Sequence, residues 1–238
     1  MRSERTLLTL MMAVLFLPAG PLLAQTGLEG SLGFLAGIPQ KDFADQVNTG
    51  GGFGGEFLWA PGAGPIAVGM SFNYLIYGSE TRTEPFSTSI PDVMVDVTTT
   101  NSILLGHLFL RAQTRQGAVQ PYVDGLLGFD YLFTETSIKD DDWHDEWDDG
   151  DHDVFSTTNF DDSAFSWGFG GGCMIPVWQE SSGKVQILVD LQGHYLRGGE
   201  AEYLKKGSIR RENGKVSYDV SKSRTDLLLI KLGASVRF

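Results

Sequence analysis

The chain is poor in cysteine and in long apolar segments, and each shortage excludes a class of fold. It holds one cysteine, Cys173, in 238 residues, so no internal disulfide can form. After Ala24 no uninterrupted apolar run approaches the roughly 20 residues that a membrane-spanning helix needs. A helical membrane protein is therefore excluded, and we read Cys173 as a small apolar residue of the wall rather than a redox group.

The first 24 residues have the pattern of an export signal. Two arginines precede an uncharged apolar run at 7–17, prolines follow this run, and Ala24 offers a small residue for cleavage. The run is too short to cross a bilayer, although a retained N-terminal anchor is the alternative. We predict a signal peptide at 1–24 and one exported β domain at 25–238.

Glycine is abundant, at 30 of 238 residues, and the chain alternates apolar and polar residues in eight stretches. The apolar rows are nearly free of charge over about ten residues, the length of a tilted strand that crosses a bilayer. An open sheet would leave its edge amides unsatisfied in lipid, so the sheet must close. We predict an all-β fold, an eight-stranded antiparallel transmembrane β-barrel with up-and-down meander connections. The eight apolar rows begin at Leu28, Phe53, Ile66, Leu104, Val123, Phe165, Val185 and Leu228.

The connections between these stretches alternate in length. Short ones at 60–64, 114–118 and 179–183 separate long ones near 39–50, 78–100, 136–163 and 198–224. Outer-membrane barrels have short periplasmic turns and long external loops. The alternation therefore predicts a cell outer-membrane location, with both ends of the barrel domain in the periplasm.

Charged residues lie on the polar rows, which face the interior of the expected barrel. An eight-stranded barrel is only wide enough for its own side chains, and buried charges persist when they are paired. We predict an interior charge network rather than an open channel; the alternatives are a narrow gated pore and a conduit with a side opening. The network residues are Glu29, Glu56, Arg111, Asp124, Asp130, Asp190, Lys231 and Arg237.

Three segments carry a resemblance to a known family. The stretch 121–129 (PYVDGLLGF) looks like a "PYVGAGLG" strand, 166–172 (SWGFGGG) like the glycine-rich strand that follows it, and 232–238 (LGASVRF) like a closing strand. The chain thus resembles the OmpA-like small outer-membrane β-barrel superfamily, which includes anchors, adhesins and small pores. The resemblance implies that the terminal Phe238 is an assembly signal for the barrel-assembly machinery.

The most acidic segment is Asp140–Asp153, with nine carboxylates in fourteen residues. Removing it would change the formal net charge from −12 to −3. Asp149, Asp151 and Asp153 have the spacing of the first ligands of a calcium loop, but neither the turn glycine nor the closing glutamate follows. We favour a solvated acidic loop with no metal and no cofactor, and a divalent cation there is the alternative.

The last long connection is rich in lysine and arginine, from Lys205 to Arg224. We expect it to attract the acidic loop and to face the phosphates of lipopolysaccharide. The expected partners are outer-membrane lipid, lipopolysaccharide, the barrel-assembly machinery and an unknown extracellular ligand, with no nucleic acid.

A lipid-modifying enzyme is the remaining alternative, and it would need a histidine, a serine two residues on and a carboxylate. Leu196 stands where the serine would follow His194, and His194 has inward parity. We interpret His107 and His194 as interior hydrogen-bonding residues, with no catalytic residues. The sequence favours a non-enzymatic outer-membrane barrel whose charged loops serve adhesion, surface recognition or envelope integrity, with a small passive pore as the alternative.

Overall fold

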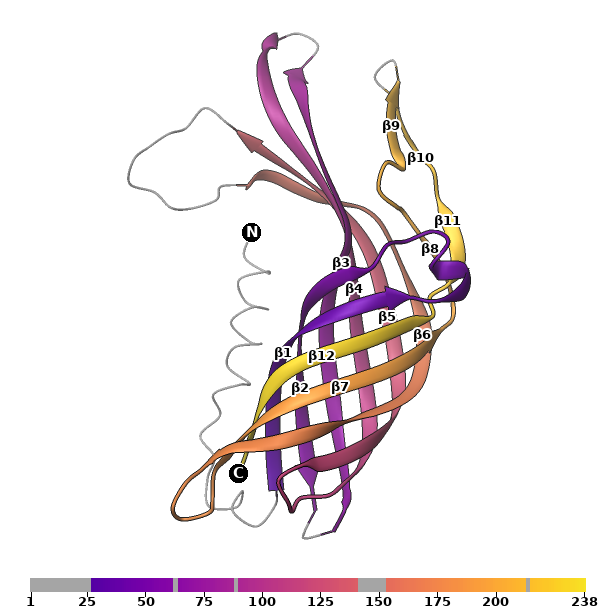
Figure 1. Cartoon of the computed structure of the whole chain (residues 1–238). Coiled ribbons are helices and arrows are strands. Elements are labelled where there is room, and N and C mark those ends of the chain that lie inside the picture. The colour runs from indigo at the N-terminus through magenta and orange to yellow at the C-terminus, as the bar shows by residue number, and fades with distance from the viewer. Residues whose placement is uncertain (1–26, 62–63, 88–89, 141–152, 213–214) are drawn as a thin grey trace, which may run out of the picture.

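The computed structural model describes residues 27–61, 64–87, 90–140, 153–212 and 215–238, and these form a closed antiparallel barrel (Figure 1). Each wall strand pairs with its neighbours in the chain, and the last strand pairs with the first. The prediction of an eight-stranded meander barrel is confirmed. The wall consists of β1 (Gly27–Pro39), β2 (Gly50–Ala60), β3 (Ile66–Ser87), β4 (Ile90–Gln113), β5 (Gln120–Asp140), β6 (Asp153–Gln179), β7 (Gln186–Gly198) and β12 (Leu227–Arg237). Among the described residues, no helix is long and apolar enough to span a membrane.

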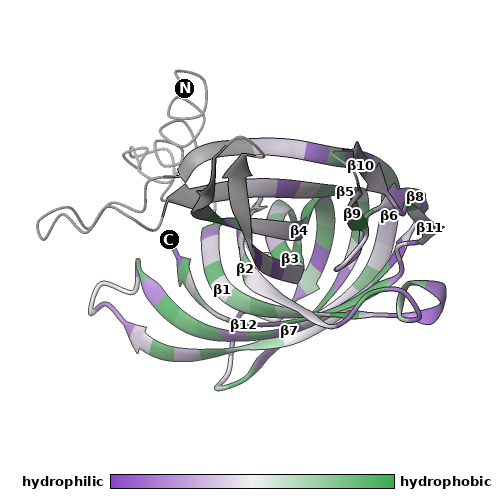
Figure 2. Ribbon diagram, turned by 90° about the horizontal axis from the view of Figure 1, so that it is seen from above, coloured by the Kyte–Doolittle hydropathy of each residue, from purple (hydrophilic) through white to green (hydrophobic). Residues whose placement is uncertain are grey.

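The outer face of the wall is apolar and the alternation along each strand explains why. Successive side chains of a strand point to opposite faces, so every second residue faces outward. Phe34, Leu108 and Val123 are all more than half exposed, whereas their neighbours Leu35, His107 and Tyr122 are buried. Figure 2 shows this alternation as green and pale residues along β1, β7 and β12. A continuous apolar band therefore surrounds the barrel.

The two ends of the barrel differ. At one end, which we call the turn end, strands are joined by the short connections around 61–65, 114–119 and 180–185. The start of β1 and the end of β12 lie at this end too, since Glu29 pairs with Arg237. The opposite end carries all the long connections and is called the loop end.

At the loop end, four wall strands continue past the apolar band as one sheet. Pairing between β3 and β4 extends to Ser87 and Ile90, and pairing of β4 with β5 and of β5 with β6 extends to Asp140 and Asp153. Long loops were expected near 78–100 and 136–163; instead, most of these residues are strand. The reason lies in their many threonines, which favour extended backbone and hydrogen-bond across strands, as Thr81 does with Thr98 at 3.0 Å. We call 78–87, 90–101, 134–140 and 153–160 the raised sheet.

The other four strands end at the loop end under a compact cover. The 3-10 turn η2 (Lys41–Phe43) packs beside β8 (Glu200–Tyr203) and β11 (Ser221–Arg224), which form a small two-stranded sheet. The ring of Phe43 makes an edge-on contact with that of Tyr203 at 5.3 Å and is fully buried. The hydroxyl of Tyr77 donates to the carbonyl of Leu204 at 3.0 Å. We call residues 41–47 and 199–208 with β11 the cap; a second hairpin, β9 (Ile209–Glu212) and β10 (Lys215–Tyr218), rises from it (Figure 1).

Candidate functional site

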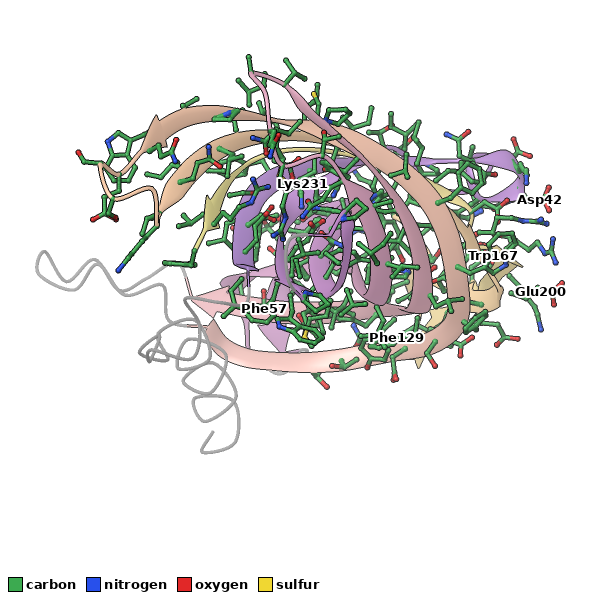
Figure 3. All side chains as sticks on the ribbon, turned by 90° about the horizontal axis from the view of Figure 1, so that it is seen from below. Asp42, Phe57, Phe129, Trp167, Glu200 and Lys231 are labelled. Carbon is green, nitrogen blue, oxygen red and sulfur yellow. The ribbon has the colours of Figure 1, made fainter. Side chains whose placement is uncertain are left out.

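The lumen holds the charged residues that the sequence placed there. Seven of the eight are almost completely buried, and the guanidinium-bearing side chain of Arg237 is 11% exposed. Figure 3 shows Lys231 pointing into the barrel while Phe129 and Trp167 lie on the outside of the wall. The question for function is whether these charges line a passage or close it.

Arg111 is the centre of the charged cluster. Its Nε and Nη2 donate to the two carboxylate oxygens of Asp124, both at 2.8 Å, and Nη2 also donates to Glu56 at 3.0 Å. The guanidinium lies 3.8 Å from the centre of the Tyr122 ring, a cation–π contact. A bidentate pair of this kind fixes both partners in place. Strands β2, β4 and β5 are thereby joined through the lumen.

Lys231 completes the connection from the opposite wall. Its Nζ donates to Glu56 at 2.7 Å and lies 3.9 Å from Asp190, whose other oxygen accepts a 2.7 Å hydrogen bond from the hydroxyl of Tyr122. His194 Nε2 lies 2.9 Å from Asp124. Contacts therefore run from β12 to β2, β4, β5 and β7 and back to β12. We call Glu56, Arg111, Tyr122, Asp124, Asp190, His194 and Lys231 the lumen ring.

Nearer the turn end, Arg237 fills the lumen below the ring. Its Nε donates to Glu29 at 2.8 Å, and its Nη1 donates to the side-chain oxygens of Gln120 and Gln186 at 2.7 and 3.3 Å. This contact joins β12 to β1, β5 and β7. The lumen is thus crossed by side chains at two levels.

Toward the loop end lies a cluster of Ser166, His107 and Asp130. Ser166 Oγ donates to Asp130 at 2.6 Å and lies 2.7 Å from His107 Nε2, while Thr225 donates to the second oxygen of Asp130 at 3.1 Å. In a catalytic triad the serine donates to the histidine and the histidine to the carboxylate. Here the serine proton is directed to the carboxylate, and Ser166 is 0% exposed. The hydrogen-bond order of a triad is therefore not reproduced, and the cluster links β4, β5 and β6 inside the lumen.

The sequence reasoning missed the contact between His107 and Ser166. The two residues are 59 positions apart, but the strand register places them in one row, with Gly128 of β5 between them. A Cβ at Gly128 would meet the backbone of strand β4 and the ring of His107. The same arrangement recurs where His194 lies over Gly170 to reach Asp124. A glycine on the inner row between two polar residues was the signal that would have found both contacts.

The lumen also contains a layer of aliphatic and aromatic side chains, which the apolar and polar alternation of the sequence did not predict. In β4, residues of both the inward and the outward row are apolar, and the inward residues Ile103, Leu105 and Phe109 are buried. These residues meet inward leucines from other strands. The inward leucines include Leu35, Leu58, Leu75, Leu126, Leu132, Leu196 and Leu229. The lumen is thus filled by apolar packing as well as by charge pairs.

The metal candidates fall mostly beyond the described part of the chain. Asp149 and Asp151 lie outside the described residues, as does the signal peptide, and Asp153 is the first residue of β6 with no described side chain. Within the described ranges, no group of three potential metal-binding side chains occurs. The expected contact between the acidic segment and the basic loop likewise lies outside the described residues. Cys173 is part of β6 and half-buried.

Comparison with known proteins gives distant structural likeness. No family model matches the chain, and no curated protein matches its sequence. Ail, the attachment invasion locus protein of Yersinia pestis, is 15% identical over 90% of this chain and 99% of its own, with a TM-score of 0.40. Neisserial surface protein A is 13% identical over 89% and 95%, with a TM-score of 0.34. A major outer membrane protein from Thermus thermophilus is 13% identical over 88% and 99%, with a TM-score of 0.37.

Proposed function

We propose that the protein is a bacterial outer-membrane barrel with a closed lumen, which serves as a rigid base for recognition at the cell surface. Its apolar band supports a membrane location, because apolar residues such as Phe34, Phe129 and Phe169 would be unfavourably exposed in water over the whole circumference. A closed barrel leaves no edge amide unsatisfied in lipid. The loop end is then external and the turn end periplasmic.

The single observation that carries the recognition role is the raised sheet. Strands β3 to β6 keep their pairing well past the apolar band, and polar, exposed residues occur beyond it, as at Thr81, Arg82 and Thr83. Anchoring alone would not need an ordered sheet standing clear of the membrane. An ordered polar surface at the external end suits contact with another molecule.

The lumen ring argues against the passive pore. Arg111 and Lys231 both hold Glu56 from opposite sides of the lumen, within 3.0 and 2.7 Å. Opening a path for solutes would expose buried charges and separate these pairs, which is costly. The enzyme alternative is disfavoured because Ser166 is buried and donates to Asp130.

The test uses the purified barrel in planar lipid bilayers and in vesicles. We expect insertion without steady unitary currents, and steady currents would refute the closed lumen. In parallel, vesicles bearing the protein are applied to arrays of neutral, acidic and basic glycans and peptides. Replacing 79–99 by an Asn-Gly turn should preserve insertion and remove array binding. Binding that survives this replacement would contradict the role given to the raised sheet.

A further inference from the structure

The raised sheet has one edge that no described strand covers, although the cap approaches the base of this edge, where Lys206 lies beside Gly78. The last pair between β2 and β3 is Gly51 with Ile76, and within the described ranges no strand pairs with the outer edge of β3 beyond it. The far edge of the sheet, on β6, is partly covered at its base: Gly199 N donates to the carbonyl of Phe165 at 2.8 Å, and Glu202 N donates to Asp162 at 2.8 Å. An unpaired edge exposes backbone N–H and C=O groups that can pair with another strand.

This edge is regular over a defined length. Register irregularities interrupt the pairing of β3 and β4 between Ile76 and Gly78 and again between Pro85 and Ser87. Between them, residues 78–84 form an uninterrupted strand with Thr81 at its centre. Natural edges are protected by bulges and by proline, and here both devices lie at the ends of the segment and leave its middle unprotected.

The charges of the segment are self-complementary about Thr81. In an antiparallel pair of two copies centred on Thr81, Glu80 of each copy lies opposite Arg82 of the other. Ser79 then lies opposite Thr83, so no like charges meet among residues 79–83. A centre at Glu80 or Arg82 would place two like charges directly opposite each other, which is destabilising.

The charged side chains are already oriented for this contact. Arg82 Nε and Nη2 donate to Glu80 at 3.0 and 2.9 Å, and the side chains of Arg82 and Glu80 remain 47% and 27% exposed. A second copy would let each guanidinium bridge its own Glu80 and that of the other copy. Thr81 and Thr83 are occupied on the sheet by Thr98 and Asp96, which holds the strand extended.

We infer that the β3 edge, residues 78–84, is a homophilic docking strand that pairs antiparallel with the same strand of a second copy. The inference rests on the proposed function, since it names a second copy of the chain as one partner of the raised sheet. Strands that rise from one membrane point the same way, so an antiparallel pair joins copies in two facing membranes. With Thr81 at the centre, the two Ile76 residues lie about 34 Å apart along the strand direction. The activity is therefore adhesion between two membranes.

The test is clustering of phospholipid vesicles without polysaccharide that carry the protein in one orientation, followed by light scattering. Wild-type vesicles should cluster with one another and not with protein-free vesicles. Glu80→Arg places cations at both 80 and 82, and Arg82→Glu places anions at both positions. Like charges then face each other between two copies of the same variant, so each variant alone should lose at least tenfold in clustering rate. A mixture of the two variants should recover it, because opposite charges again face each other. The double variant E80R/R82E should also cluster.

The matched controls are Glu202→Arg and Lys222→Glu, an exposed cross-strand pair at 3.6 Å in the cap with the same changes in charge. These controls should cluster like wild type. Three results would overturn the inference: wild-type vesicles that stay dispersed, single variants that cluster like wild type, or a mixture that fails to recover. Planar-bilayer insertion and array binding are measured on the same samples. If they hold while clustering fails, the docking inference is wrong and the proposed function stands; if insertion fails, the proposed function is wrong.

Discussion

The two halves of the barrel wall share one apolar band and finish in opposite ways. Strands β3 to β6 continue past the band as the raised sheet, which carries exposed polar residues and is held by hydrogen bonds such as that from Thr83 to Asp96. Strands β7, β12, β1 and β2 end beneath the cap, where Phe43 and Tyr203 are buried. The first half ends in a sheet with an exposed surface, and the second half ends in a packed cap. We expect stability to reside in the lumen and cap, and recognition in the raised sheet.

Removing the central cation of the lumen ring should have the largest effect on stability. Arg111→Ala leaves Glu56 and Asp124 buried without their shared cation, and we expect a loss of about 3–5 kcal/mol in unfolding free energy. Urea unfolding in vesicles, followed by tryptophan fluorescence, measures it. Arg82→Ala, which breaks an exposed pair in the raised sheet, should cost no more than about 1 kcal/mol. Equal losses would show that the raised sheet contributes as much to stability as the lumen does.

Opening the cap should come next. Phe43→Ala removes a fully buried ring, and we expect a local cost of about 3 kcal/mol. Because this ring holds the cap and not the wall, limited proteolysis should cut within 199–208 far faster, while the barrel remains folded in vesicles. Unchanged cleavage would mean that the cap is held by other contacts.

The inner glycines offer a sharper comparison within the wall. Gly170→Ala puts a methyl group against the carbonyl of Gly193 and the ring of His194, and we expect a cost of about 1–3 kcal/mol. Gly193→Ala and Gly125→Ala are the controls, because an added Cβ there meets nothing within 4 Å. Both controls should change stability little. A similar cost at all three positions would mean that the effect comes from the loss of glycine itself and not from the space beneath His194.

Shortening the raised sheet should change stability least among the large alterations. Replacing 79–99 by a two-residue turn leaves the lumen ring and the cap in place, so the unfolding free energy should stay within about 1 kcal/mol of wild type. Urea unfolding of the shortened chain is the measurement. A loss as large as that of Arg111→Ala would contradict the assignment of stability to the lumen.

The smallest expected effect is an alkaline weakening of the cap. Lys41 Nζ donates to Asp226 at 2.7 Å, and this hydrogen bond raises the pKa of Lys41 above its ordinary 10.5. The contribution is fully present below pH 10.5 and is lost as the pH rises through the raised value. Burial also raises the pKa of Tyr203, so ionisation of this phenol likewise weakens the cap as the pH rises. Cap proteolysis at about pH 9 and about pH 11.5 should therefore differ more in wild type than in Lys41→Met.

The wall could be predicted from sequence because the bilayer imposes one apolar parity on every strand. Leu32, Phe34 and Leu232 all face outward as that parity requires. The inward positions of the eight charged residues followed from the same rule, but their pairing did not, because partners such as Glu56 and Lys231 are 175 residues apart. The extension of β3 and β4 past the band was missed because polar, threonine-rich alternation resembles a solvated loop. The interior layer of Ile103 and Leu105 was missed because both parities of β4 are apolar.

The last strand, β12, pairs with the first, β1, along a seam that runs from the turn end to the loop end of the barrel. At the turn end of this seam Glu29 pairs with Arg237. Every other strand pairing of the described wall joins strands that follow one another in the meander and can form strand by strand. Two interior ion pairs, Arg237 with Glu29 and Lys231 with Glu56, span this seam and form only when the cylinder closes, whereas Glu56 can meet Arg111 of β4 before that step. Closure is then the step that completes the interior charge pairing. A chain that stalls with the seam open would carry the Glu29 carboxylate on its first strand and the Arg237 guanidinium on its last strand without this ion pair, and would thus be chemically distinct from the finished barrel.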